Sequence, residues 1–497
     1  MGPSAWAEEK ADVSQSAKEA RDAVEAVREA ILRISREVWK TPELSLHEEK
    51  SSEIHLRELR EAGFRIVSTG TSGIPTAFLA EWSQGEGGAK IGFLPEYDAL
   101  PDLGNAAEPR QAPGPIGVEV GHGCGHNMLG AACTGAAFAL KKMMIDGKVP
   151  GTIRVYGCAA EETEGAKVFM ARDGLFDDLD ACLAWHPGPM NATGLLRTAA
   201  ANMVRVRYSG STAHAGVDPW EGRSALKGAE LFGIGIQFMR EHLKPTTRLH
   251  YIYTDSGTAA NVVPATAEIF IMIRDQDRED VNTVTEWVRD VANGAATSTQ
   301  TEVEFDHFFG LHDLLPNETL VNHIHAHMSA LSLEWSEEEQ EFAKTCQREM
   351  GLPDTGMMSN IMPVLPEITT GGGTDVGDIS FNTPTGLFAI ATMPIGVGLH
   401  TWPVTACGGT TIGDKGSIYS AIIMAGVGYD LMTDPKLRAA ARADFDRRKA
   451  GRKYVSPLVE TRLRPDGIPQ HLLLRDGSQE LGVEFIEEAV VSKTPAP

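Results

Sequence analysis

The chain has 497 residues, 42% of them hydrophobic and 23% charged, with a formal net charge of −23. This length exceeds what a single compact core usually supports, so two or more domains are expected. So acidic a composition argues against nucleic acid and membrane surfaces as partners, because both attract basic patches.

Cysteine usage and the N-terminus bear on the cellular compartment. Six cysteines in so long a chain do not indicate a disulfide framework, and no run of about 18 apolar residues predicts a membrane span. Residues 4–7, Ser-Ala-Trp-Ala, have the form of a signal-peptide cleavage site, but no apolar segment precedes them. A cytoplasmic location is favoured, with the periplasm as the alternative. Five cysteines are expected to be buried thiols: Cys133, Cys158, Cys182, Cys346 and Cys407.

The first 198 residues carry the pattern of an α/β sheet. Apolar residues at helical spacing predict a long helix over 8–39 and a second over 46–62. Further along, strands are predicted at 77–82, 90–94, 152–158 and 181–185, and a helix at 131–144. Polar residues follow several of these strands, which places their side chains at the carboxyl edge of a sheet, where such folds bind ligands.

The pattern changes near residue 199. Alternating strands at 204–208, 249–254 and 268–274, with helices at 223–241 and 278–293, predict an inserted α+β module. The domains are therefore predicted as a first catalytic part at 1–198, an insert at 199–313, and a second catalytic part at 314–497. From about residue 436 the chain is interpreted as a surface appendage.

Residues 121–126, Gly-His-Gly-Cys-Gly-His, place two imidazoles and a thiol on a glycine-rich segment. Cys124 and His126 are two residues apart, so on an extended loop both can point the same way. Further donors are Glu162, His186 and His400. Such a set is typical of a catalytic divalent-metal site. The alternatives are a capped core histidine at His186 and a loop histidine at His400.

Glu161 and Glu162 are adjacent, so in an extended segment they face opposite ways. One can bind a metal while the other collects a proton from water and passes it to the leaving amine. The alternative is a solvated acidic turn, which fits Glu164 better.

Five ordered motifs between about residues 25 and 450 closely resemble the metal-dependent aminoacylase/carboxypeptidase superfamily. Within it, the chain is most similar to the branch that holds the B-type subunits of p-aminobenzoyl-glutamate hydrolases and the indole-3-acetyl-amino-acid hydrolases. The motifs are Gly-His-Gly-Cys-Gly-His (121–126), Ala-Glu-Glu (160–162), Trp-His-Pro-Gly (185–188), Ser-Thr-Ala-His-Ala-Gly (211–216) with Asp-Pro-Trp-Glu-Gly-Arg-Ser-Ala (218–225), and Thr-Asp-Val-Gly-Asp (374–378).

The resemblance implies an α/β fold: a discontinuous metallopeptidase-like catalytic domain, with a mixed sheet flanked by helices, and an inserted α+β lid that dimerises. It implies that Glu161 is the general base and that five residues bind two divalent ions: Cys124, His126, Glu162, His186 and His400. Thiolate and imidazole donors suit Zn, whereas the resemblance to the p-aminobenzoyl-glutamate branch points to Mn.

The resemblance also gives roles to residues of the insert. It implies that His214 reaches the partner subunit's active site and polarises the scissile carbonyl. It implies that Asn261 and Arg274 hold the substrate's carbonyl or carboxylate. For Arg274 the alternative is an ion pair with Asp275 or Asp277, and for Asn261 it is a turn.

One position departs from the superfamily pattern. Distant members take a metal ligand from a His two residues before Asp98, and here that place is Glu96. Glu96 and Asp98 are interpreted as residues that support the ligands from behind. Asp375 and Asp378 either line the pocket or cap a helix.

These observations predict a metal-dependent amidohydrolase that cleaves an N-acyl amino acid, with an aromatic acyl group favoured. The same site could serve peptide cleavage or deamination of an aromatic amine, or the chain could be a non-catalytic subunit. The expected partners are a small-molecule substrate, a second copy of the chain through the lid and, from the resemblance to a B-type subunit, a further subunit.

Overall fold

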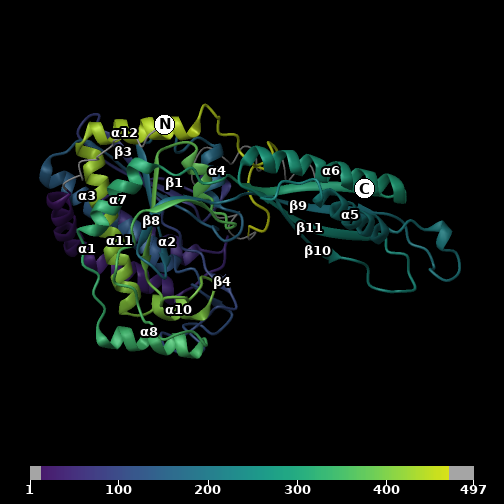
Figure 1. The fold of residues 1–497 in the computed structure, drawn as a ribbon, viewed down its shortest axis with the longest axis horizontal. Coiled ribbons are helices and arrows are strands. Elements are labelled where there is room, and N and C mark those ends of the chain that lie inside the picture. The colour runs from purple at the N-terminus through teal and green to yellow at the C-terminus, as the bar shows by residue number, and fades with distance from the viewer. Residues whose placement is uncertain (1–12, 469–497) are drawn as a thin grey trace, which may run out of the picture.

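The computed structural model describes residues 13–468, and the predicted cleavage site at 4–7 lies outside this range. The chain forms two parts, as Figure 1 shows. A larger part holds an eight-stranded sheet covered by helices, and a narrower part extends from its side. The extended part consists of residues 200–311, so the larger part is built from the segments before and after it.

The large sheet is mixed, with the strand order β1-β2-β6-β3-β7-β14-β8-β13. The four central strands β6, β3, β7 and β14 are mutually parallel, and the outer pairs include antiparallel neighbours. The predicted mixed α/β sheet is therefore confirmed. The strands are β1 (Arg65–Thr69), β2 (Phe78–Gln84), β3 (Ala89–Phe93), β6 (Gly151–Gly157), β7 (Ala181–Gly188), β8 (Ala192–Arg197), β13 (Leu365–Thr369) and β14 (Thr385–Ala391); a separate short pair is β4 (Leu100–Pro101) and β5 (Val120–Gly121).

Helices cover this sheet in layers. Helices α3 and α11 contact its central strands, α1 packs over both of them, and α7 packs on β8 and β14. The helices of the larger part are α1 (Ser14–Lys40), α2 (Glu49–Glu61), α3 (His126–Gly147), α4 (Ala166–Arg172), α7 (Glu318–Ser329), α8 (Glu337–Glu349), α9 (Val376–Ser380), α10 (Trp402–Gly408), α11 (Thr411–Thr433) and α12 (Pro435–Lys449).

Helix α3 is apolar around most of its circumference. By length and composition it could cross a membrane, but 83% of its apolar window is buried inside the protein. A helix that is apolar on all sides and packed between α1, α11 and the sheet is a core helix. Its small residues, such as Gly135 against Ile31, allow this close packing.

The extended part is a four-stranded antiparallel sheet in the order β10-β11-β9-β12. Its two helices pack against each other and against β9 and β11, so they cover one face. The elements are β9 (Ala200–Ser209), α5 (Ala225–Arg240), β10 (Arg248–Asp255), β11 (Thr266–Asp275), α6 (Arg278–Thr299) and β12 (Glu302–Leu311). Strand β10 lies at the edge, and most of its side chains are exposed.

The interpretation of the chain from residue 436 as a surface appendage is wrong for α12. Ala441 belongs to the main core, and Phe445 packs with Leu315 and Phe381. Beyond the helix, Tyr454 donates a hydrogen bond of 2.8 Å to Asp378. The basic residues of the segment concealed this buried face, although some of them also pack against the protein: Arg448 is only 11% exposed, and Arg442 lies over the Phe445 ring.

The parallel strands bring their carboxyl ends to one edge of the large sheet. Glu96 and Asp98 follow β3, Glu161 and Glu162 follow β6, and His186 lies near the end of β7. This edge therefore gathers polar side chains from segments that are distant in sequence, as expected for a parallel sheet.

Candidate metal centre

A tight turn, and not an extended loop, positions Cys124 and His126. Gly125 has a φ of +78°, a left-handed conformation that favours glycine, and His126 begins α3. One atom from each of Cys124, His126 and His186 lies within 4.8 Å of the other two. The two side chains therefore face the same space, as expected, although the turn is the reason.

Asp98 fixes the ring of His126, which is fully buried. The Asp98 carboxylate lies 2.8 Å from His126 Nδ1, and it also accepts hydrogen bonds from the Ser45 hydroxyl and the Glu162 backbone N–H. Burial lowers the pKa of His126, but neighbouring Cys124 and Asp98 outweigh it and raise the pKa well above its usual value. With Nδ1 occupied in this way, Nε2 is directed into the cluster.

His186 is oriented in the same manner. Its Nδ1 lies 2.7 Å from the Pro187 carbonyl oxygen, and its Nε2 lies 3.5 Å from Cys124 Sγ. Burial lowers the pKa of His186 and favours the neutral ring. A neutral imidazole with one nitrogen anchored and the other facing a thiol has the form of a metal ligand.

The two adjacent glutamates lie in a turn, so the expectation of an extended segment at Glu161 and Glu162 is wrong. Ala160, before them, has a φ of +54°, and its N–H donates to the buried Glu48 carboxylate at 2.7 Å. Because of this turn, both carboxylates approach one ring: each has an oxygen 3.9 Å from His126 Nε2.

His400 reaches the cluster from a distant loop. Its backbone N–H donates to the Gly123 carbonyl oxygen at 2.8 Å, and its φ is +59°. Its Nε2 lies 3.3 Å from Glu162 Oε1. The side chain remains about half exposed, so the centre opens to solvent on this side.

Two sets of donors share Cys124. One contains Cys124, His126 and His186, and the other contains Cys124, Glu162 and His400. In each set the donor atoms lie within 4.8 Å of one another. All five predicted ligands therefore come together as two overlapping three-donor groups, which could hold two cations with a common ligand.

The buried donor atoms fit a cation. Within residues 13–468, His126 Nε2, Glu162 Oε1 and Glu96 Oε2 are buried and have no hydrogen-bond partner. Leaving such groups unpaired costs about 1–3 kcal/mol each. Thiol, imidazole and carboxylate donors together match the ligand preferences of zinc-like divalent ions.

Glu96 lies inside the cluster, whereas Asp98 lies behind it. Glu96 Oε2 is 3.2 Å from His126 Nε2, and Glu96, His126 and Glu161 form a further set of converging donors. Glu96 therefore offers a donor to the cluster itself, in addition to its pairing with Lys167. Glu96 holds the sequence position, two residues before Asp98, at which distant relatives were expected to carry a His.

The sequence reasoning missed Lys167. This fully buried lysine lies 2.8 Å from Glu96 Oε1 and 2.5 Å from Asp375 Oδ1. Asp375 precedes α9, but its side chain makes no capping hydrogen bond, so it serves as a partner of Lys167. The sequence contains a feature that could have identified it, because Lys167 is the single charged residue in the apolar helical segment Ala166–Ala171.

The adjacent glutamates have opposite electrostatic surroundings. Burial, with Glu96 and Asp375 nearby, raises the pKa of Glu161 well above its usual value. Burial also opposes charge on Glu162, but the neighbouring His400, 3.3 Å away, and His126 outweigh it and lower the pKa. Neighbouring carboxylates with pKa values pushed apart are typical of a division between proton carrier and charged ligand.

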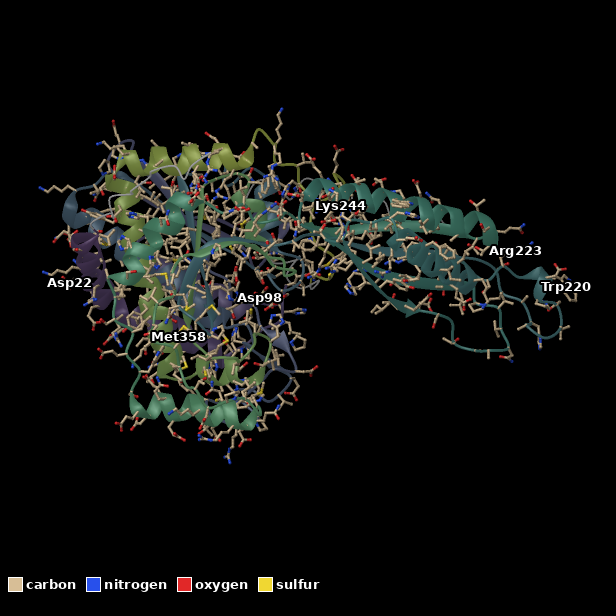
Figure 2. All side chains as sticks on the ribbon, viewed as in Figure 1. Asp22, Asp98, Trp220, Arg223, Lys244 and Met358 are labelled. Carbon is tan, nitrogen blue, oxygen red and sulfur yellow. The ribbon has the colours of Figure 1, made fainter. Side chains whose placement is uncertain are left out.

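The structure does not bring His214 and Asn261 to this centre within one chain. The Ala215 N–H donates to the Asn261 carbonyl oxygen, and the loop of His214 carries Trp220. Figure 2 shows Trp220 at the outer end of the extended part, far from Asp98. Both residues belong to this outer loop region.

Arg274 lies at the inner end of the extended part. Its Nη1 donates to the Gly371 carbonyl oxygen at 2.7 Å and its Nε contacts Met272 Sδ at 3.0 Å. Asp277 pairs with Arg197 at 2.8 Å. Arg274 therefore faces the glycine-rich segment 371–373, on the side of the larger part.

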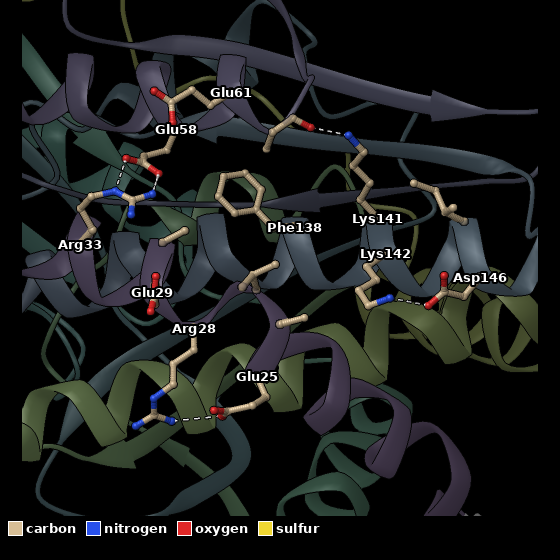
Figure 3. A pocket seen from close by; sticks show the side chains of 15 residues that line it. Glu25, Arg28, Glu29, Arg33, Glu58, Glu61, Phe138, Lys141, Lys142 and Asp146 are labelled. Atoms are coloured by element: carbon tan, nitrogen blue, oxygen red, sulfur yellow. Dashed lines mark hydrogen bonds and ion pairs between the residues drawn. The ribbon is translucent and has the colours of Figure 1, made fainter.

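Two cavities differ in their relation to the centre. A surface groove of about 810 Å³ lies between α1, α2 and α3. Its cations are already engaged: Arg33 pairs with Glu58, Lys142 pairs with Asp146, and Lys141 donates to the Ala62 carbonyl oxygen (Figure 3). A smaller cavity of about 200 Å³ is lined by His186 and mostly apolar residues, including Leu314 and Leu387. The smaller cavity adjoins the metal centre.

Comparison with known proteins identifies relatives over most of the chain. The sequence profile of peptidase family M20/M25/M40 matches residues 94–400. The chain is 35% identical over 465 residues to the B-type subunit of p-aminobenzoyl-glutamate hydrolase from Escherichia coli, covering 88% of this chain and 96% of that protein. It is 28% identical to Xaa-Arg dipeptidase of Mus musculus, covering 86% and 91%.

A solved structure supports the fold. A dinuclear metal-binding peptidase of the M20 family from Bacillus subtilis superimposes with a TM-score of 0.54 at 19% identity, covering 82% of this chain and 99% of that one. The resemblance inferred from the motifs is confirmed by these matches.

Proposed function

The chain belongs to peptidase family M20/M25/M40, and on that basis we propose that it hydrolyses the amide bond of an N-acyl amino acid with an aromatic acyl group. The chain is a hydrolase that acts on amide bonds, as its family and its relatives indicate. The substrate class is taken from the B-type subunit of p-aminobenzoyl-glutamate hydrolase, which matches over nearly its whole length. The apolar cavity beside His186 is consistent with an aromatic acyl group.

In this proposal two divalent cations, Zn or Mn, are held by Cys124, His126, Glu162, His186 and His400. Bound there, such cations supply Lewis acidity, which polarises a carbonyl and lowers the pKa of water to about 7. The single observation that carries the proposal is the convergence of buried, unpartnered donor atoms, His126 Nε2 and Glu162 Oε1 within residues 13–468, beside the Cys124 thiol.

Glu161 acts as the general base. Its carboxylate lies at the centre, and the buried surroundings that raise its pKa favour uptake of a proton from the attacking water. Glu161 then delivers that proton to the nitrogen of the leaving amine, and the C–N bond breaks. Asp98 keeps the His126 ring in place throughout, through its 2.8 Å contact with Nδ1.

The extended part acts as a lid and forms a homodimer. Large apolar side chains on α5 and β10 are exposed: Phe238 by 73%, Ile252 by 60% and Ile234 by 51%. Large exposed apolar side chains and an exposed edge strand are typical of a protein interface. In the dimer, His214 polarises the substrate's carbonyl in the other subunit's centre, and Asn261 and Arg274 bind the substrate.

The second proposed partner is a further subunit, because the relative that matches over nearly its whole length is a B-type subunit. Dipeptide cleavage is the second candidate activity. The likeness to Xaa-Arg dipeptidase over 86% of the chain supports it.

The test is product analysis by mass spectrometry on a panel of aromatic N-acyl amino acids, dipeptides and aryl amines. We expect release of an aromatic acid and an amino acid, abolished by chelation and restored by Zn or Mn. Glu161→Gln with unchanged metal content is the matched control. Turnover that survives exhaustive chelation contradicts the metal mechanism, and exclusive cleavage of dipeptides selects the second candidate.

A further inference from the structure

A second group of converging metal-type donors lies among the helices of the larger part. His323 and His327 are four residues apart on α7, so they project from the same face of that helix. Their Nε2 atoms lie 2.8 Å and 2.7 Å from a single oxygen, Asp430 Oδ2, on α11. The three donor atoms lie within 4.8 Å of one another.

Neighbouring residues hold this cluster in place. The Ser16 hydroxyl, on α1, donates to the same Asp430 oxygen at 3.1 Å. Gly426 faces the ring of His327, and a Cβ at Gly426 would lie only 2.5 Å from His327 Cε1. The glycine, one turn before Asp430 on α11, therefore leaves the space that the ring fills.

The cluster is enclosed but open at one side. His327 is 1% exposed, His323 9% and Asp430 18%. A cation could therefore enter beside Asp430 and meet two imidazole nitrogens and one carboxylate oxygen.

We propose that His323, His327 and Asp430 form a second divalent-metal site, separate from the centre at the carboxyl edge. Two imidazoles and a carboxylate, without a thiolate, suit a borderline cation such as Zn²⁺, Co²⁺ or Ni²⁺ better than Mg²⁺ or Ca²⁺. To hold a cation, each neutral ring would carry its proton on Nδ1, so that its Nε2 lone pair could face the cation.

The site is structural. Neither of the two cavities described above is lined by any of its three residues. A cation there links α7, which follows the lid, to α11, which packs on α3 and the sheet. Because the unfolded chain lacks this geometry, binding raises the melting temperature.

The test uses the full chain, stripped with a chelator and dialysed against Zn²⁺, with metal per chain measured by mass spectrometry. We expect His323→Gln and Asp430→Asn each to bind one equivalent less than the wild type. His325→Gln is the matched control: it lies on the same helix, but its ring contacts the Met362 carbonyl oxygen, so it should retain the wild-type stoichiometry. Equal stoichiometry in all four proteins overturns the proposal.

Two further measurements keep this result independent of the carboxyl-edge centre and of folding defects. A His126→Gln variant should still lose one equivalent when Asp430→Asn is added, whatever the state of the first centre. Anomalous diffraction from wild-type crystals soaked in Zn²⁺ should show a peak between the three side chains. The absence of that peak at a Zn²⁺ concentration that fills the first centre overturns the site without any variant.

Discussion

The carboxyl edge of the large sheet and the outer end of the lid both carry residues that the family resemblance connects with catalysis, but they are built differently. At the edge, donors from distant segments converge while buried, for example His126 between Asp98 and Glu96. At the outer end, His214 and Asn261 lie in an exposed loop whose contacts are mostly local. The first region gathers its donors within one chain, whereas the role proposed for the second depends on the proposed homodimer.

The largest expected effect is on kcat, and it tests the role proposed for Glu161 at the carboxyl edge. Glu161→Gln removes the proton acceptor but keeps the size of the side chain, so kcat should fall by about 10³-fold, within the range usual for general acid–base catalysis. Metal content should remain at the wild-type level, because the proposed ligands are intact. Steady-state kinetics and metal analysis of the same preparation measure both. A fall of less than tenfold would contradict this role for Glu161.

The next effect concerns the buried charges beneath the centre. Lys167→Met leaves Glu96 and Asp375 without their shared cation, and breaking a buried ion pair costs about 3–5 kcal/mol in the free energy of unfolding. Urea denaturation of chelated protein measures this change. Lys142→Met is the control: its pair with Asp146 is exposed and contributes at most about 1 kcal/mol. Similar losses in the two variants would show that the network around Lys167 does not hold the edge together.

The outer loop of the extended part, which contains His214, is tested by complementation between two impaired variants. His214→Ala should lower kcat by about 10²-fold, the loss usual for removing one group that stabilises the transition state. When it is mixed with Glu161→Ala, hybrid dimers should recover activity, since one centre then has both a native Glu161 and a native His214. Activity assays after subunit exchange measure the recovery. No recovery, with exchange verified by mass spectrometry, would place His214 in the centre of its own chain.

The sequence predicted the proposed metal ligands at the carboxyl edge better than it predicted the residues that hold them in place. The residue types of the proposed ligands and their positions after strands could be predicted from the sequence, because the carboxyl ends of parallel strands lie at one edge of the sheet. The turn at Glu161 and Glu162 could not be predicted. It depends on the positive φ of Ala160 and on the contact of Ala160 with Glu48, which lies 112 residues before Ala160 in the chain. The roles of Lys167 were equally hidden, since its two partners come from segments far apart in the chain.

In the extended part, too, contacts between distant segments limited what the sequence could predict. The strands at 204–208, 249–254 and 268–274 were predicted because half-buried strands alternate in polarity, and each has a counterpart in β9, β10 or β11. Strand β12 was missed: only Phe309 and Gly310 are buried in it, so the two-residue pattern is weak. Pairing with β9, which lies about a hundred residues earlier, fixes this strand.

The smallest expected effect measures the free-energy cost of burying the Glu48 carboxyl beside the carboxyl edge of the sheet. Glu48 is fully buried, and burial, with Asp98 nearby, raises its pKa from 4.5 to about 8. A carboxyl whose pKa is higher in the folded state stabilises the fold most below pH 4.5, and that stability is lost as pH rises toward 8. Between pH 6 and 8, chelated wild type should therefore lose about 2 kcal/mol relative to Glu48→Gln, because one pKa unit corresponds to about 1.4 kcal/mol. Denaturation curves of both proteins at each pH measure the difference. Parallel pH profiles would contradict the raised pKa of Glu48 in the folded state.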